Sequence, residues 1–175
     1  MNRSTALALA LAGAVTLVLA SHPTARAASA SKTLAPLGGA TTWFNGRVTP
    51  TSLRGKVVLV DVFTIECINC INVTPNLRSL TARLSGSDFA VVGVHTPETK
   101  WQHDRSTVVS NLSKLGVTWP VAIDNDYAIW SAYNVNAWPT QLLFDRHGQL
   151  RKTFVGDSQD AEVDAAVDAL LHERG

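Results

Sequence analysis

Only two cysteines occur in the 175-residue chain, and they lie three residues apart in the stretch Cys67-Ile-Asn-Cys70. Such a pair can alternate between two thiols and one disulfide, because a thiolate attacks a disulfide sulfur and the neighbouring thiol completes the exchange. Six residues before Cys67, Asp61 interrupts the apolar run Val57–Phe63. A carboxyl group in a buried strand is costly to ionise, so it would hold a proton near neutral pH. These three residues predict thiol–disulfide chemistry assisted by a buried acid.

A strand and a helix must position this pair. The β-branched run Val57–Phe63 is typical of a strand covered on both faces. Apolar residues then recur at helical spacing: Val73, Leu77, Leu80 and Leu84. Cys67 would therefore lie at a helix N-terminus, where unpaired N–H groups and the helix dipole favour a thiolate. Cys70 would lie one turn deeper, so we expect Cys67 to attack and Cys70 to resolve the mixed disulfide.

Three local alternatives stay open at this point. Asp61 could turn outward at a frayed strand edge, which would leave it an ordinary surface carboxyl. The helix could begin only after Pro75, because proline inside a helix costs about 3 kcal/mol. Glu66 would oppose the helix dipole and tune the Cys67 thiolate if its carboxylate were close, and it would do little if it pointed to solvent.

The rest of the chain continues the alternation of strands and helices. We expect strands at 89–94, 119–124, 140–145 and 149–155, and helices at 104–115, 126–133 and 158–173. The last two strands are so close in sequence that they must form an antiparallel hairpin. This order predicts an α/β domain of thioredoxin type, with a central mixed sheet flanked by helices and one αβ insertion.

The N-terminal segment has a different composition from the rest. Arg3, an uncharged run at 5–20 and small residues up to Ala27 are typical of a secretory signal peptide cleaved near Ala27. A retained membrane anchor is the alternative, although the run is short for a spanning helix of about 20 residues. We expect a signal peptide at 1–27, a linker at 28–40 and one domain at 41–175, exported to the periplasm, the cell envelope or the medium.

Charge and composition narrow the function further. Without residues 1–27 the chain has 13 basic and 14 acidic residues, so binding to nucleic acid has no electrostatic basis. Export permits disulfides. However, a purely structural bridge between Cys67 and Cys70 would close so short a loop that it would add little stability. A chemical role for the pair is therefore favoured.

Several motifs resemble the thioredoxin superfamily in order and spacing: Asp61, the CxxC pair, Pro75 five residues after Cys70, and Trp-Pro-Thr before a strand-turn-strand. The stretches LRGKVVLVDVFT, CINC, GVHTPE, WPVAIDNDYAIWSAY and WPTQLLFDRHGQL are similar to those of exported TlpA/ResA-like thiol-disulfide oxidoreductases. They especially resemble the thioredoxin-like domain of DipZ-type proteins, over about residues 40–173.

The resemblance implies a role for each matching position. Cys67 would be the nucleophile, Cys70 the resolving cysteine, Asp61 the buried acid and Pro139 a cis-proline facing the disulfide. The backbone beside Pro139 would bind an extended segment of the partner protein, and Trp138 is placed to touch that partner.

The resemblance also implies partners and the direction of electron flow. The expected substrates are protein thiols and disulfides, with electrons passing to oxidised envelope proteins and with neither metal nor organic cofactor. The membrane electron-transfer domain of DipZ-type proteins has no counterpart in this sequence, so a membrane electron donor would be a separate protein, and we expect a monomer. Glu66 stands where thioredoxin has tryptophan, and Ile-Asn replaces its Gly-Pro, so thioredoxin's redox potential is not carried over.

Three rival functions share some of these features. A disulfide-forming oxidase would use the same pair in the opposite direction. A thiol peroxidase is suggested by Thr64-x-x-Cys67, but that family expects a proline where this chain has Val60. A copper- or metal-delivery protein would combine the two thiolates with His95, although two sulfurs and one nitrogen make an incomplete zinc site.

Overall fold

The computed structural model describes residue 30 and residues 32–173. Six strands form one sheet in the order β1-β4-β3-β2-β5-β6. They are β1 (Trp43–Phe44), β2 (Val57–Phe63), β3 (Phe89–His95), β4 (Val121–Ile123), β5 (Thr140–Phe144) and β6 (Leu150–Val155). Strands β2, β3 and β4 are parallel, whereas β1, β5 and β6 pair antiparallel with β4, β2 and β5. The predicted mixed sheet and antiparallel hairpin are confirmed.

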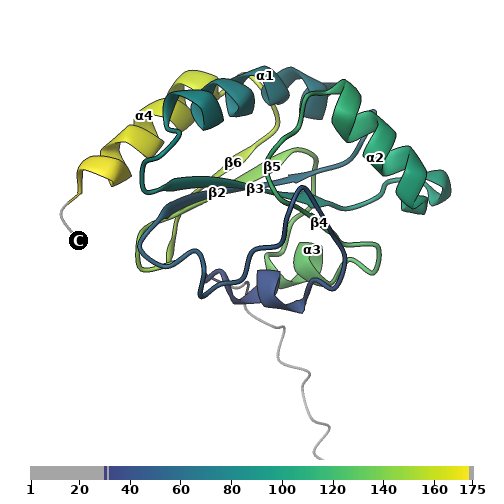
Figure 1. The fold of residues 1–175 in the computed structure, drawn as a ribbon, viewed down its shortest axis with the longest axis horizontal. Helices are drawn as coiled ribbons and strands as arrows, with labels where there is room; N and C mark the ends of the chain where they lie inside the picture. Colours follow the sequence, from purple (N-terminus) through teal and green to yellow (C-terminus); the bar gives the residue numbers. More distant parts are fainter. Residues whose placement is uncertain (1–29, 31, 174–175) are drawn as a thin grey trace, which may run out of the picture.

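Helices cover both faces of the sheet. They are α1 (Ile68–Arg83), α2 (Arg105–Lys114), α3 (Ala128–Ala132), α4 (Asp160–His172) and the 3-10 helices η1 (Ala35–Gly39) and η2 (Lys100–His103). Figure 1 shows α1, α2 and α4 on one face and α3 with η1 on the other. In the described part of the chain, no helix combines the length and apolar character needed to cross a bilayer.

Strand β2 lies at the centre of the core, and all seven of its residues are buried. Val57, Leu59 and Phe63 pack in the cluster beneath α1, α2 and α4. The alternate residues Val58, Val60 and Val62 pack on the opposite face, beside η1 and α3. This two-sided burial explains the uninterrupted apolar run, because neither face of the strand meets solvent.

The structure corrects one expectation and excludes one alternative. The segment predicted as a linker at 28–40 is partly folded, because Leu34, Leu37 and Ala40 are buried against the sheet. The segment is rich in Ser, Thr and Ala, but its residues Leu34 and Leu37 pack against the face of β2 formed by Val58, Val60 and Val62. In addition, α1 begins at Ile68 and contains Pro75, so the alternative that the helix starts after this proline is wrong. The predicted signal peptide, residues 1–27, lies outside the described residues.

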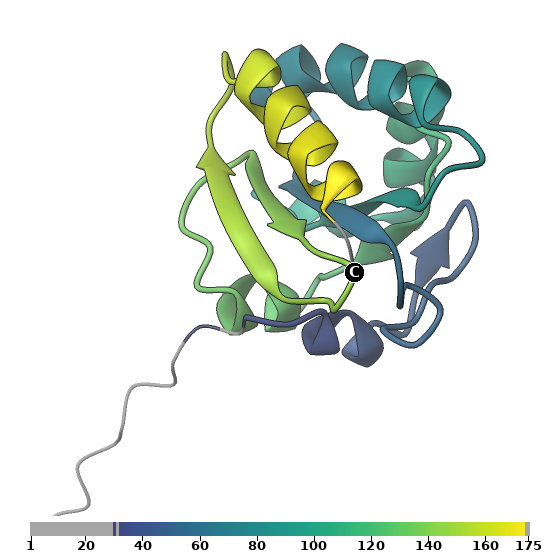
Figure 2. The same cartoon turned by 90° about the vertical axis from the view of Figure 1, so that its left-hand side faces the viewer.

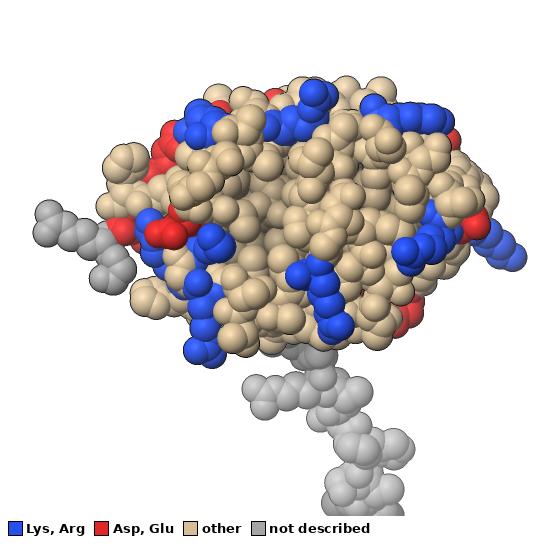
Figure 3. Space-filling model, viewed as in Figure 1, with Lys and Arg blue, Asp and Glu red and all other residues tan. Residues whose placement is uncertain are grey.

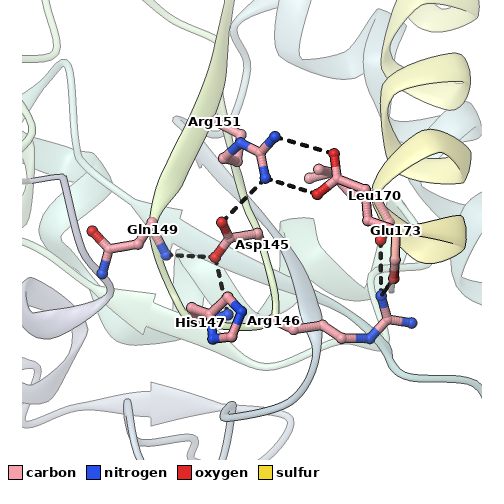
Figure 4. Close-up of polar contacts among 7 residues, drawn as sticks. All are labelled: Asp145, Arg146, His147, Gln149, Arg151, Leu170 and Glu173. Carbon is pink, nitrogen blue, oxygen red and sulfur yellow. Dashed lines mark hydrogen bonds and ion pairs between the residues drawn. The ribbon is translucent and has the colours of Figure 1, made fainter. Parts of the chain in front are cut away.

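The β5–β6 turn holds the end of α4, which lies across the sheet beside α1 (Figure 2). Arg146 donates to the carbonyl oxygens of Leu170 at 2.8 Å and Glu173 at 3.2 Å (Figure 4). It also donates to the carbonyl oxygen of Leu171 at 3.0 Å. The last carbonyls of a helix have no partner within the helix, so the guanidinium replaces water there. Arg151 adds a two-bond ion pair with the Glu173 carboxylate, at 2.9 and 3.1 Å.

We expect Arg146→Ala to lower the free energy of unfolding by about 1–2 kcal/mol, because two carbonyls in the last turn of α4 and the carbonyl of Glu173 lose a charged donor. Urea denaturation measures this loss. The control is Arg83→Ala, which removes only the exposed Arg83–Asp168 ion pair and should cost about 0.5 kcal/mol or less. Equal losses of unfolding free energy in the two variants would show that Arg146 does not stabilise the end of α4.

Candidate active site

The two cysteines lie where β2 passes into α1. Cys67 is the N-cap residue of α1, and its sulfur accepts a hydrogen bond from the backbone N–H of Cys70 at 3.4 Å. Cys67 is partly exposed, Cys70 is only 4% exposed, and both are free thiols. The sulfur that caps the helix is therefore open to a partner, while the other lies one turn deeper in the protein.

The turn between strand and helix depends on an unusual backbone conformation. Glu66 has a φ of +71°, in the left-handed region that non-glycine residues seldom adopt. Its side chain is exposed, whereas the preceding Thr64 and Ile65 are buried. The reversal at Glu66 lets the buried strand end and places Cys67 at the start of the helix.

Asp61 is buried in the middle of the sheet and is 4% exposed. Its register neighbours are Gly93 on β3 and Gln141 on β5. Burial raises the pKa of Asp61 from 3.8 to about 7, and a hydrogen bond with Gln141 opposes part of that rise. One carboxylate oxygen has no hydrogen-bond partner. The alternative of an outward-facing Asp61 at a strand edge is wrong, because β2 is a central strand.

Cys70 packs in the same cluster as Leu59 and Phe63, on the sheet face from which Asp61 also projects. Burial raises the pKa of the Cys70 thiol well above its ordinary value, and the hydrogen bond with Cys67 and the charge of Asp61 raise it further. The backbone of Thr64 acts in the opposite direction, through a hydrogen bond that lowers the pKa of Cys70. Deprotonation of Cys70 therefore needs a base.

The loop before β5 approaches the dithiol from the other side. The Trp138–Pro139 peptide bond is cis, in agreement with the prediction from the sequence. The Cys67 thiol lies 3.9 Å from the carbonyl oxygen of Trp138. The Trp138 ring packs against that of Trp130 in a tilted arrangement, with 4.5 Å between the ring centroids. The structure thus brings Cys67, Cys70, Trp138 and Pro139 together where β2 ends, and Asp61 lies two residues before that end, inside the sheet.

His95 lies at the end of β3 and is fully buried, edge-on to the ring of Phe63 at 5.7 Å. Burial, followed by the charge of His103, lowers the pKa of His95 to about 4, so its ring is neutral at pH 7. Neither ring nitrogen has a hydrogen-bond partner. Among the described residues, no three His, Cys, Asp or Glu side chains form a group that could hold a metal ion.

Two buried glutamines near the site were not identified from the sequence. Gln141 interrupts the apolar strand β5 just as Asp61 interrupts β2, and this polar residue in a buried run was an available signal. Gln102 lies in the short polar segment η2, where nothing in the sequence indicates burial, yet it is 3% exposed. Its amide accepts a hydrogen bond from the Thr64 hydroxyl at 2.7 Å.

Replacing the buried acid tests the cost of its burial. The pKa of Asp61 in the folded protein, about 7, exceeds its ordinary value of 3.8. Between these values the folded protein binds more protons than the unfolded chain, so the free energy of unfolding falls as the pH rises through this window. Above pH 7 the full penalty, about 4 kcal/mol at about 1.4 kcal/mol per pKa unit, is present.

Because asparagine cannot ionise, we expect reduced Asp61→Asn to be more stable than the wild type at pH 8, by up to about 4 kcal/mol. The difference should shrink toward zero by pH 4. Urea denaturation across this range measures it, and the titration of His95 cancels in the difference since both proteins contain it. A difference that does not change with pH would show that Asp61 is not held protonated by burial.

Comparisons with known proteins agree with this geometry. Residues 44–170 match the family model described as Redoxin. Protein DipZ of Mycobacterium bovis is 35% identical over 144 residues, which cover 78% of this chain but 20% of that protein. Thiol-disulfide oxidoreductase YkuV of Bacillus subtilis is 28% identical over 138 residues, covering 78% of this chain and 93% of that protein. The chain thus spans about a fifth of the length of DipZ.

Solved structures extend the likeness to three dimensions. A thioredoxin-like protein in its oxidized form has a TM-score of 0.74 at 27% identity, covering 82% of this chain and 97% of that one. A thiol-disulfide isomerase from Corynebacterium glutamicum has a TM-score of 0.71 at 26% identity, covering 77% and 94% of the two chains. The chain therefore belongs to the Redoxin family and has the thioredoxin-like fold.

Proposed function

We propose that this chain is an exported thiol-disulfide oxidoreductase that reduces disulfides in other proteins. The observation that carries the proposal is the arrangement of the dithiol: Cys67 is partly exposed at the N-terminus of α1, and Cys70 is buried one turn behind it. The names of relatives such as YkuV, and of the similar isomerase structure, describe the same chemistry in those proteins.

The reaction takes place in two exchanges. The Cys67 thiolate attacks one sulfur of the substrate disulfide, so a Cys67–substrate bond forms, and the other substrate sulfur leaves as a thiolate and takes a proton. Cys70, once deprotonated, attacks the sulfur of Cys67, which forms the Cys67–Cys70 disulfide and releases the second substrate sulfur. Two electrons and two protons pass from the dithiol to the substrate.

Asp61 is the proposed base for the second exchange. The pKa of Cys70 is raised by burial, so its thiol does not ionise unaided at neutral pH. The pKa of Asp61 is about 7, so its carboxylate can accept a proton in that range and release it again. A surface carboxylate, with a pKa near 4, would be too weak a base for this step.

The cis-proline loop is the proposed binding site for the substrate. The Trp138 carbonyl already faces Cys67, so an extended substrate segment next to it would place its own sulfur against the nucleophile. Backbone hydrogen bonds beside Pro139 would hold that segment as an added strand, whatever its side chains. Glu66, which is exposed next to Cys67, would act on the potential of the couple only through its charge.

Localisation, partners and direction form part of the same proposal. The signal peptide at 1–27 would export the chain to the periplasm or cell envelope, where a separate membrane protein would return it to the dithiol form. Burial of Cys70 favours the reducing direction, since it leaves the thiolate form of the reduced protein poorly stabilised. On the face seen in Figure 3, basic side chains are scattered among acidic and uncharged ones, which does not favour a nucleic-acid partner.

Cysteine variants test the two roles. We expect Cys70→Ser to accumulate mixed disulfides with substrate proteins, because Cys67 still attacks and nothing completes the exchange. We expect Cys67→Ser to trap none, since Cys70 is buried. Non-reducing electrophoresis of envelope extracts measures both, with the double variant as the control. Equal trapping by the two single variants would overturn the assignment.

A further inference from the structure

A buried glutamine on η2 lies directly behind the redox turn. Gln102 comes from the connection between β3 and α2 and is 3% exposed. A primary amide has two donors and two acceptor positions, and burying them without partners is costly. The partners of this amide therefore indicate why it is buried there.

The amide joins two segments that lie far apart in the sequence. Its oxygen accepts from the Thr64 hydroxyl at 2.7 Å and from the backbone N–H groups of Glu98 at 2.7 Å and Thr99 at 3.2 Å. Its nitrogen donates to the carbonyl oxygen of Ile65 at 2.8 Å. The bonds to Glu98 and Thr99 fix the amide to its own loop, and the other two reach across to the turn before the dithiol.

The two residues held in this way control the position of the dithiol. Thr64 and Ile65 immediately precede Glu66, where the backbone takes its left-handed conformation, and Cys67, which caps α1. The ladder between β2 and β3 ends at the bond from Thr96 N–H to the Phe63 carbonyl, so the turn that follows lies beyond the sheet.

Thr64 also touches the chemistry through its main chain. Its backbone makes the hydrogen bond that opposes the effect of burial on the Cys70 sulfur. A shift of this segment would therefore change the donor that the Cys70 thiolate meets as it attacks Cys67. The Thr64 hydroxyl donates to Gln102, so the side chain of Thr64 helps to hold the turn in place.

We propose that Gln102 is a positioning residue for the redox couple: through Thr64 and Ile65 it holds the turn that sets the main-chain donor facing Cys70. This inference rests on the proposed thiol–disulfide function. The inference predicts different effects on the two exchanges. The attack by exposed Cys67 does not depend on Gln102, whereas the attack by buried Cys70 depends on the turn that Gln102 supports.

Two substitutions test the link without emptying the site. Gln102→Glu keeps an oxygen for Thr64, Glu98 and Thr99, and in its ionised form it has no donor for the Ile65 carbonyl. Thr64→Val removes the hydroxyl on the other side with little change in volume. We expect each to slow release of an oxidised model peptide from its Cys67 mixed disulfide by about three- to tenfold, the usual effect of losing one buried hydrogen bond. Formation of the mixed disulfide should change less than about twofold.

Asn45→Ala is the matched control. The Asn45 amide also donates to main-chain carbonyls, of Val117 at 2.9 Å and Trp119 at 3.3 Å, but it contacts no part of the redox turn. It should lower the midpoint of urea unfolding and leave both exchange rates unchanged. This variant distinguishes a positioning role from a general loss of stability.

The equilibrium of the couple with glutathione gives a second readout that needs no protein substrate. If the Thr64 main chain moves, the sulfur of reduced Cys70 loses its hydrogen-bond donor and the dithiol form becomes less stable. The equilibrium of each variant should therefore shift toward the Cys67–Cys70 disulfide by at least about threefold. If the wild type undergoes no thiol–disulfide exchange with any model peptide, the proposed function is refuted. The equilibrium with glutathione would still test the role of Gln102 in that case. If Gln102→Glu and Thr64→Val match the wild type in release rate and in this equilibrium, Gln102 only supports its own loop and the inference is wrong.

Discussion

Desolvation of the Asp61 carboxyl by the sheet is the interaction on which the redox site depends. The side chain projects from a strand that is covered on both faces, and Gln141 is its polar neighbour on β5. The same burial surrounds Cys70, whose thiolate is disfavoured by the lack of solvent and by the Asp61 charge. The raised pKa of Asp61 lies closer to that of the Cys70 thiol than the pKa of a surface carboxyl would, so proton transfer from Cys70 to Asp61 costs less than transfer to a surface carboxylate.

Topology brings the reacting parts to one edge of this sheet. The parallel strands β2 and β3 end there, and antiparallel β5 begins there. Consequently the N-terminus of α1, the segment leading to η2 and the loop with Pro139 converge, although they come from distant parts of the sequence. In open α/β sheets, sites form outside the carboxyl ends of the strands for this reason.

The sequence was sufficient for the parts of the fold that have strong periodicity. Strand β2 has the predicted bounds, and the order of strands and helices is as expected, because continuous apolar runs and helical spacing report burial directly. The short β1 and the folded start of the chain at Leu34 and Leu37 were missed. Two-residue strands and single buried leucines give no periodic signal, and only tertiary packing defines them.

The site shows the same division. Cys67, Cys70 and Asp61 could be found because their residue types are unusual in their surroundings, and Pro139 by its place before a strand. The buried amide of Gln102 could not, since a glutamine in a polar segment is ordinary until the fold covers it. Nor could the left-handed backbone at Glu66, because a glutamate there carries none of the signal that a glycine would give.

The reduction potential of the Cys67–Cys70 couple tests the central claim most directly. It is obtained by equilibrating the purified protein in glutathione or dithiothreitol redox buffers and quantifying the free thiols. A reductant with a poorly stabilised Cys70 thiolate should have a strongly reducing potential, clearly below the value of about −180 mV of protein disulfide isomerase. A value near about −120 mV, typical of the strongest disulfide-forming enzymes, would contradict the account and make the chain an oxidase.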